Sequence, residues 1–311
     1  MSAGGLRIGT RGSALALWQA RHVAAALRAA HPDLPVEIVE IVTTGDRDRA
    51  RPLSALGGKG VFVREIERAL LAGAVDLAVH SLKDLPGELP AGLCLLGTVA
   101  RAPVEDVLVL RPPLAGLAPG DLPAGTTVGT GSLRRAALLR RHAPQVEVRP
   151  IRGNVPTRLS KVEAGDVDGV ILARAGLVRL GILPPHARIL PASSFLPSPG
   201  QGLLGLEARA DDARVHALVA AIADAEATCA HDLERAFVHR LGADCHVPVA
   251  ALATVEGPRL RARANVLAPD AGAVAEATWS GPVGAAAEGG RILAERVLAA
   301  GGAAILASLA G

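Results

Sequence analysis

The sequence contains little of what several common classes of protein need. Only three of its 311 residues are cysteines, Cys94, Cys229 and Cys245, and none of them has the C-x2-C spacing of a zinc site. This sparse, odd set predicts reduced thiols in the cytoplasm and no metal site. The N-terminus lacks a basic segment followed by an apolar one, and no apolar stretch approaches the roughly 20 residues that cross a bilayer. We therefore expect a cytoplasmic protein that contacts no membrane.

Aromatic residues and lysines are also scarce. Aromatic residues make up 2% of the chain, and tyrosine is absent. Nucleic-acid binding is not expected, because few rings are available to stack on bases and the net charge of +3 is modest. Lysine occurs only at Lys59, Lys83 and Lys161, two of them in the short segments GGKG and HSLKD. The GGKG segment lacks the spacing and the following hydroxyl of a P-loop, which disfavours ATP.

The first two thirds of the chain alternate short apolar runs with helical patterns, which predicts βαβ units and an α/β fold. Strands predicted at residues 6–10 and 126–130 each pass through Gly-Thr to a serine in an N-cap position, Ser13 and Ser132. This short repeat favours two domains of one architecture, and after residue 202 clustered strands indicate a smaller α+β domain. Further strands are predicted at 36–42, 75–80, 146–150, 169–173, 203–207, 247–254, 260–267 and 273–279, and helices at 14–30, 61–72, 133–142, 155–164, 214–223, 231–240 and 289–309.

Positively charged and capping residues follow several of these strands. Ligands of open α/β sheets lie at the carboxyl ends of strands, so such an array predicts an anion site. Arginine binds carboxylates in a bidentate manner, which favours a ligand with several carboxylates. A single arginine is more often only a solvated side chain, so the interpretation depends on the set. Its members are Arg11, Ser13, Ser132, Arg134, Arg135, Arg152, Arg158 and Arg179.

Two residues have the chemistry of a reactive centre. Asp84 follows Lys83 directly after a predicted strand, among cations that favour its charged form. It could stabilise a developing positive charge or shuttle a proton, or it could form an ordinary salt bridge. Cys245 lies in a predicted turn, where a reachable thiolate can be a covalent attachment point, although a lone loop cysteine is commonly unreactive. His246 would point to the opposite face of an extended chain, which disfavours a cysteine hydrolase.

Eight segments, in order along the chain, form a specific series. They are LRIGTRGSALALWQA from Leu6, GGKGVFVREIERALL from Gly57, DLAVHSLKDLP from Asp76, VGTGSLRRAALL from Val128, IRGNVPTRLSKV from Ile151, ILARAGLVRLG from Ile171, PGQGLLGLE from Pro199 and ERAFVHRLGADCHVPV from Glu234. Together they resemble the hydroxymethylbilane synthase (porphobilinogen deaminase) family. The resemblance implies a transferase that condenses four porphobilinogen molecules head to tail, with release of ammonia, to hydroxymethylbilane in porphyrin and haem biosynthesis.

The resemblance also implies two periplasmic-binding-protein-like domains facing a cleft and a smaller α+β C-terminal domain. The first domain would comprise residues 1–101 and 199–220, the second 102–198, and the C-terminal domain 221–311, with the cofactor cysteine on a loop. A monomer is expected, which passes its product to uroporphyrinogen-III synthase. The alternative is a non-enzymatic anion-binding protein of periplasmic-binding architecture, and the extra third domain counts against it.

Individual residues receive roles from the same resemblance. Cys245 matches the residue that holds a dipyrromethane cofactor through a thioether, and Asp84 matches the central catalytic carboxylate. The cofactor-binding positions are Lys83, Asp84, Ser132, Arg134, Arg135 and Arg152. The substrate-binding positions are Arg11, Ser13, Lys59, Phe62, Arg152, Arg158, Arg179 and Gln201. Two departures from the family, Ala55 where some members have a second lysine and Ala243 where a second glycine often precedes the cysteine, remove no residue that the chemistry requires.

Overall fold

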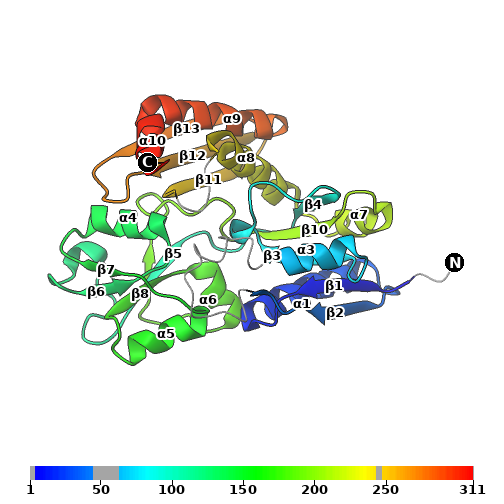
Figure 1. The fold of residues 1–311 in the computed structure, drawn as a ribbon, viewed down its shortest axis with the longest axis horizontal. Coiled ribbons are helices and arrows are strands. Elements are labelled where there is room, and N and C mark those ends of the chain that lie inside the picture. Colours follow the sequence, from blue (N-terminus) through cyan, green and yellow to red (C-terminus); the bar gives the residue numbers. More distant parts are fainter. Residues whose placement is uncertain (1–3, 45–62, 243–246, 311) are drawn as a thin grey trace. The chain divides into compact units, whose positions relative to one another are not determined.

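Two five-stranded sheets and one three-stranded sheet organise the described part of the chain (Figure 1). The computed structural model describes residues 4–44, 63–242 and 247–310. Helices connect the strands of both larger sheets, so the α/β class predicted from the alternating pattern is confirmed. The sheet nearest the C-terminus is antiparallel, as expected for the smaller α+β part.

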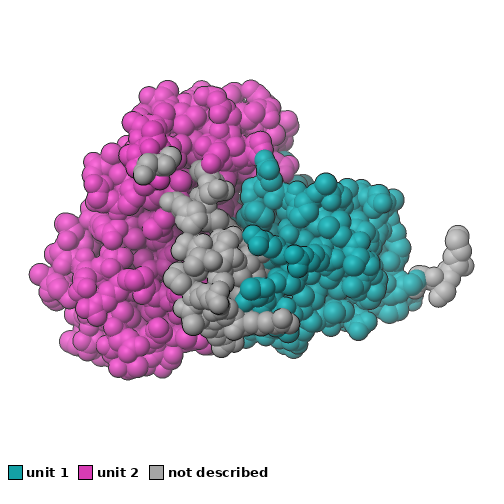
Figure 2. Space-filling view, viewed as in Figure 1, with its two compact units in different colours: residues 1–102, 202–231 teal, residues 103–201, 232–311 magenta. Residues whose placement is uncertain are grey.

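The chain forms two compact units, and each is discontinuous in sequence (Figure 2). One unit combines residues 1–102 with 202–231, and the other combines residues 103–201 with 232–311. The chain thus leaves the first unit, builds a sheet of the second unit, and returns before it forms the C-terminal sheet.

The first unit contains a five-stranded sheet with helices between its strands. Its elements are β1 (Leu6–Thr10), α1 (Ala14–Ala30), β2 (Val36–Glu40), α3 (Arg64–Leu71), β3 (Leu77–Ser81), β4 (Leu93–Thr98), β10 (Leu204–Arg209) and α7 (Ala213–Ala220). The strand order is β2-β1-β3-β10-β4, in which β1 runs parallel to β2 and β3 while β10 lies antiparallel between β3 and β4. The predicted elements are confirmed with small shifts of their ends, and β4 is an additional strand that the pattern does not predict.

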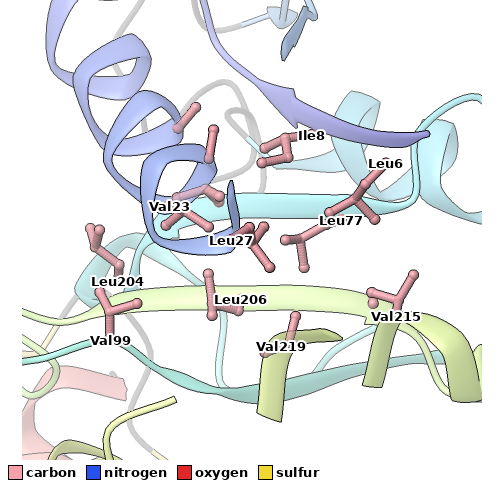
Figure 3. Close-up of a cluster of buried hydrophobic side chains, with 14 of the residues drawn as sticks. Leu6, Ile8, Val23, Leu27, Leu77, Val99, Leu204, Leu206, Val215 and Val219 are labelled. Carbon is pink, nitrogen blue, oxygen red and sulfur yellow. The ribbon is translucent and has the colours of Figure 1, made fainter. Parts of the chain in front are cut away.

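The core of this unit joins the sheet to helices on one of its faces. Figure 3 shows side chains of β1, α1, β3, β10 and α7 gathered in one cluster. Leu6, Leu27, Leu77, Leu206 and Val219 are completely buried there. Since each belongs to a different element, burial of their apolar surface holds the strands and the covering helices together.

Replacement of Leu77 by alanine is expected to lower the free energy of unfolding by about 2–5 kcal/mol, because it leaves a cavity in a fully packed cluster. Leu71→Ala serves as the control, since Leu71 is an exposed leucine of the same unit and should change stability by at most about 0.5 kcal/mol. Denaturant unfolding followed by circular dichroism measures both. Equal effects of the two substitutions would contradict the assignment of Leu77 to the core.

The second unit contains a sheet of the same size. Its elements are β5 (Asp106–Leu110), β6 (Thr127–Gly129), α4 (Leu133–His142), β7 (Glu147–Arg149), α5 (Val155–Glu163), β8 (Gly169–Ala173), α6 (Arg174–Leu180) and β9 (Arg188–Leu190). The strand order is β7-β6-β8-β5-β9, with β6 parallel to β7 and β8, and β5 antiparallel to β8 and β9. The predicted strands and helices are confirmed, while β5, β9 and α6 are additional. The turn expected at Gly176 is wrong, because Gly176 lies inside α6.

The two larger sheets share one strand arrangement. In each, the first three strands of the order are parallel, and the middle one of these three is β1 or β6. The last two strands of the order extend the sheet, and each pairs antiparallel with the strand before it. Strands β1 and β6 are each followed by a helix that begins after a serine N-cap, Ser13 or Ser132. The internal repeat seen in the sequence is thereby confirmed as a repeat of architecture.

The C-terminal part of the second unit is an antiparallel sheet in the order β11-β12-β13 covered by a helix. Its elements are α8 (Ala225–Leu241), which begins in the first unit, β11 (Val249–Glu256), β12 (Arg259–Leu267), β13 (Val274–Pro282), α9 (Ala286–Val297), a π-helical turn (Leu298–Gly302) and α10 (Ala303–Ala310). The three predicted strands and the terminal helical region are confirmed. Gly289 lies against the ring of Trp279, which brings α9 close to β13.

The C-terminal helical run is longer than the sequence pattern indicates. By length and composition alone, Val283–Leu309 could cross a membrane, so the expectation that no segment reaches this length is wrong. The run is bent, because Gly301 adopts a φ of 109° between α9 and α10. Leu293 and Val297 of α9 are buried, and α9 packs on β12 and β13. Packing inside the unit thus accounts for the apolar face of α9.

Candidate active site

The carboxyl ends of β1 and β3 bring four of the predicted residues to one edge of the first sheet. Arg11 and Ser13 follow β1, whereas Lys83 and Asp84 lie in a 3-10 turn directly after β3. Because β1 and β3 are parallel neighbours, both strand ends point to the same edge. The placement at strand ends is therefore as the sequence pattern predicts.

Two polar contacts order the first turns of helix α1, and the second of them fixes the helix to this edge. The Ser13 Oγ accepts a hydrogen bond from the backbone N–H of Ala16 (3.3 Å), which caps the helix. The buried Gln19 side chain donates from Nε2 to the Ser81 Oγ at the end of β3 (2.8 Å). The first turns of α1 and the last residue of β3 consequently hold each other in place. Gln19 did not emerge from the sequence pattern, because only the pairing of the two elements reveals its partner.

Asp84 is exposed although its neighbours in the turn are anchored. Leu82 and Leu85 are buried in one hydrophobic cluster, and the Leu82 N–H donates to the Leu203 carbonyl (3.1 Å). Asp84 itself forms no ion pair with any residue of the described ranges. The alternative role of Asp84, an ordinary salt bridge, is thus not found among the described residues. A rigid turn presents the Asp84 carboxylate to solvent at the edge where ligands of such sheets bind.

The second sheet carries the larger part of the predicted arginine set. Ser132 follows β6 and accepts at Oγ from the N–H of Arg135, so that it caps α4 (3.4 Å). Arg152 follows β7, before Asn154 caps α5. Arg179 lies near the end of α6, which follows β8. The segments that follow these three parallel strands begin at the same edge of the sheet, and Arg179 lies further along α6.

Asp106 is the centre of a buried ion-pair network at this edge. Its side chain is fully buried, and Arg134 Nη2 donates to Oδ2 (2.7 Å) while Arg135 Nη2 and Nε donate to Oδ1 (2.7 and 3.1 Å). The carbonyl oxygens of Leu196 and Ile171 accept from Arg134 and Arg135, respectively. The two arginines, proposed from the sequence as ligand contacts, therefore also hold the first turn of α4 onto β5.

The protonation of this network is set by its own charges. Burial by itself would raise the pKa of Asp106, but the Arg134 and Arg135 charges and the hydrogen bonds from Arg135 and Gln201 hold that pKa below its ordinary value. Burial lowers the pKa of Arg134, against the opposing effect of Asp106. Two guanidinium groups on one carboxylate leave this edge of the sheet with a net positive charge.

Gln201 joins the same network. Its Nε2 donates to the Asp106 Oδ1 (2.9 Å) and to the Val104 carbonyl (2.7 Å), and its side chain is buried. The adjacent Gly200 N–H donates to the buried carboxylate of Glu234 on α8 (2.6 Å), whose other oxygen accepts from Ala253 on β11 (2.8 Å). The segment that ends with Gln201 is thus fixed on both sides.

Arg152, Arg158 and Arg179 contribute further positive charge. Arg158 Nε donates to the Gly153 carbonyl (2.9 Å). The Nη1 atom of Arg152 is buried and has no hydrogen-bond partner among the described residues. Burial lowers the pKa of Arg179 to about 10, because a desolvated guanidinium is less stable in its charged form. A bound carboxylate would give Arg152 Nη1 a partner and would favour the charged form of Arg179.

Three predicted site residues lie outside the described residues: Lys59, Phe62 and Cys245. Besides Gln19, sequence reasoning missed the buried polar residues Asp106 and Glu234. Asp106 offered a signal, since it is an acidic residue that begins an apolar segment in a chain whose other strand-end charges are mostly positive. The sequence contains no comparable signal for Glu234, because a buried glutamate on a helix cannot be told from a solvated one by the sequence alone.

Two family models match almost the whole chain. The model described as porphobilinogen deaminase, dipyromethane cofactor binding domain, matches residues 6–217, and the model described as porphobilinogen deaminase, C-terminal domain, matches residues 228–299.

Two porphobilinogen deaminases from other organisms agree with this match. A porphobilinogen deaminase of Syntrophomonas wolfei is 45% identical over 301 residues, which cover 97% of each chain. A porphobilinogen deaminase of Acidithiobacillus ferrooxidans is 48% identical over 280 residues, which cover 89% of this chain and 90% of that one. Among solved structures, the periplasmic VFT2 domain of Bordetella pertussis BvgS superimposes with a TM-score of 0.43 at 15% identity, over 70% of this chain and 86% of that one.

Proposed function

We propose, because the chain belongs to the porphobilinogen deaminase family, that the strand-end residues of its two larger sheets bind and process porphobilinogen. The protein is a transferase that condenses four porphobilinogen molecules head to tail, with release of ammonia, to the linear tetrapyrrole hydroxymethylbilane in porphyrin biosynthesis. The non-enzymatic anion-binding alternative is not favoured, since both family models match. The observation that carries the proposal is the exposed Asp84 carboxylate, since every other charged member of the predicted set of site residues is a lysine or an arginine.

The arginine set fits the charge of the substrate. Each porphobilinogen brings two carboxylates, so every addition increases the negative charge that the protein must balance. Arg11 in the first unit and Arg152, Arg158 and Arg179 in the second are proposed to bind these groups through charge-assisted hydrogen bonds. Ser13, Lys59, Phe62 and Gln201 complete the proposed substrate positions.

Asp84 is proposed to act on the reacting atoms. When the substrate loses its amine as ammonia, a positively charged pyrrole remains, and a carboxylate beside it lowers the energy of that charge. The Asp84 oxygens can also accept hydrogen bonds from pyrrole N–H groups and can receive or return a proton. The buried Leu82 and Leu85 anchor the backbone on both sides of Asp84, which limits the reorganisation that the turn must undergo during the reaction.

The residues present fit a dipyrromethane cofactor that carries several carboxylates. Arg134 Nε and Arg152 Nη1 are buried donors without hydrogen-bond partners among the described residues, and a carboxylate is the acceptor such groups favour. Ser132, Arg135 and Lys83 are the other proposed cofactor contacts. When bound, the dipyrromethane supplies the pyrrole carbon to which substrate is added, and Cys245 is proposed to hold it through a thioether.

The mass of the intact protein tests this attachment. Purified from a host that makes porphobilinogen and then denatured, the protein is expected to exceed its sequence mass by two deaminated porphobilinogen units. Cys245→Ser should show the sequence mass alone and no activity, because its hydroxyl is a far weaker nucleophile than a thiolate. Cys229→Ser is the matched control and should keep the added mass. If the unsubstituted protein had only its sequence mass, also after incubation with porphobilinogen, the tethered mechanism would be wrong.

The cellular context is a further part of the proposal. A cytoplasmic monomer that passes hydroxymethylbilane to uroporphyrinogen-III synthase is supported by the family resemblance. The sparse cysteines also support a reducing compartment.

A further inference from the structure

A second cluster of arginines lies on the C-terminal sheet of the second unit, in a sequence region that contains none of the site residues named above. It lines an open depression of about 650 Å³ on the face of the sheet, called the cavity below. The cavity is bounded by strands β11, β12 and β13, by residues 192, 193 and 196, and by Arg296 of α9. All of these residues belong to one compact unit.

The charge of the cavity is not balanced by its own carboxylates. Arg263 pairs with Glu276 through two hydrogen bonds (both 2.9 Å), and Arg261 pairs with Glu256 (3.0 Å). Among the described residues, the two remaining arginines contact only neutral groups. Arg259 donates to the Ser280 Oγ (3.2 Å), and Arg296 donates to the Thr278 carbonyl (2.7 Å).

Neither Arg259 nor Arg296 therefore has a carboxylate partner in the ranges that the structure describes. An anion would supply the missing counter-charge, and both side chains are exposed enough to reach one.

The spacing of the charges indicates an extended ligand. Arg259, Arg261 and Arg263 alternate along β12, so they point to one face of the sheet at intervals of about 7 Å. From the first to the third arginine the row spans about 14 Å, which is wider than a single phosphate or carboxylate. Thr254 and Ser280 lie opposite Arg261 on the neighbouring strands and offer hydroxyl donors.

The cavity is not uniformly polar. Leu196 and Leu252 contribute apolar surface beside the arginine row. A ligand with an apolar body and several carboxylates at its rim would satisfy both surfaces, whereas an inorganic anion would leave the apolar part uncovered.

We propose that this cavity binds a polycarboxylated tetrapyrrole, the chemical class of the enzyme's own product. The identity of the ligand rests on the proposed function, while the anionic character of the ligand rests on Arg259 and Arg296. None of the residues that line the cavity is a proposed substrate or cofactor position, so product or a later intermediate would bind there without using those positions.

Equilibrium dialysis of the holoenzyme against uroporphyrin I, a stable polycarboxylated tetrapyrrole, tests the proposal. The double variant Arg259→Gln/Arg296→Gln is expected to lose one class of binding site or to weaken it at least about tenfold, because two charge-assisted contacts are removed. The matched control is Arg240→Gln/Arg291→Gln, which removes two exposed arginines of the same unit that pair with Glu295 and Glu288. This control should bind like the unsubstituted protein.

Activity measured on the same preparations separates the two proposals. Both double variants should condense porphobilinogen at the unsubstituted rate. If all three proteins are active and bind uroporphyrin I equally, the cavity proposal is overturned while the proposed function stands. If the unsubstituted holoenzyme itself is inactive, the proposed function fails whatever the dialysis shows. Displacement by inorganic phosphate at constant ionic strength, to the same extent in every variant, would also overturn the cavity proposal.

Discussion

Replacement of Asp84 by asparagine is expected to reduce the rate of porphobilinogen addition about 100- to 1,000-fold. Asparagine keeps the size of the side chain and one oxygen acceptor, but it lacks the charge that opposes the cation formed when ammonia leaves. Because this interaction exists mainly in the transition state, kcat should fall while KM changes little. Rapid-quench measurement of a single addition reports the rate of the step without the contribution of product release.

Two controls give this result its meaning. The mass of Asp84→Asn should still include the two-unit cofactor, which separates a catalytic defect from a failure of attachment. Asp33→Asn removes an exposed carboxylate beyond the other end of α1 and should leave the rate unchanged. Asp84→Glu, which keeps the charge but moves it, should fall between these limits. An unaltered single-addition rate in Asp84→Asn would exclude the proposed role.

Replacement of Asp106 by asparagine is expected to destabilise the second unit by about 3–5 kcal/mol. The substitution leaves Arg134 and Arg135 as buried charges without a counter-ion, and an uncompensated buried charge costs far more than the pair itself contributes. Activity should fall as well, because the same arginines begin α4 at the candidate site. Thermal unfolding gives the change in stability. The matched control is Glu147→Gln, which breaks the exposed pair with Arg149 and should not measurably change the midpoint.

The same network predicts how stability depends on pH. The pKa of Asp106 is lower in the folded protein than its ordinary value of 3.8, so the unfolded chain binds the proton more readily. The stability that Asp106 contributes is therefore complete above that value and is lost as the pH falls below it. Asp106→Asn should lack this part of the acid sensitivity. Identical acid profiles of the two proteins would show that Asp106 does not titrate as the geometry requires.

The positions of the candidate site residues could be predicted because they depend on local pattern. A strand followed by a capping serine or an arginine is visible in ten residues, and β1 with Ser13 and β6 with Ser132 are found where the pattern places them. The exposed carboxylate of Asp84 after β3 follows from the same logic. The positions of the site residues at strand ends could thus be predicted without any knowledge of the tertiary structure.

What could not be predicted depends on contacts between distant parts of the chain. Arg134 and Arg135 were interpreted only as ligand contacts, because Asp106 lies 28 and 29 residues away and its strand was not recognised. The insertion of β10 between β3 and β4 joins residues more than 100 positions apart. Alternating polarity marks a strand, but it does not specify which neighbour the strand will pair with.

The position of β10 has a consequence for the order in which the protein folds during synthesis. All strands of the second larger sheet lie between Asp106 and Leu190, so they leave the ribosome together and can pair as soon as they emerge. The first sheet begins earlier in the chain, yet its strand β4 has no neighbour until Leu204–Arg209 has been translated. The later-made sheet is therefore expected to be complete before the earlier-made one. During that interval β3 and β4 present unpaired edges, which makes the nascent first unit the part of the chain most in need of protection from aggregation.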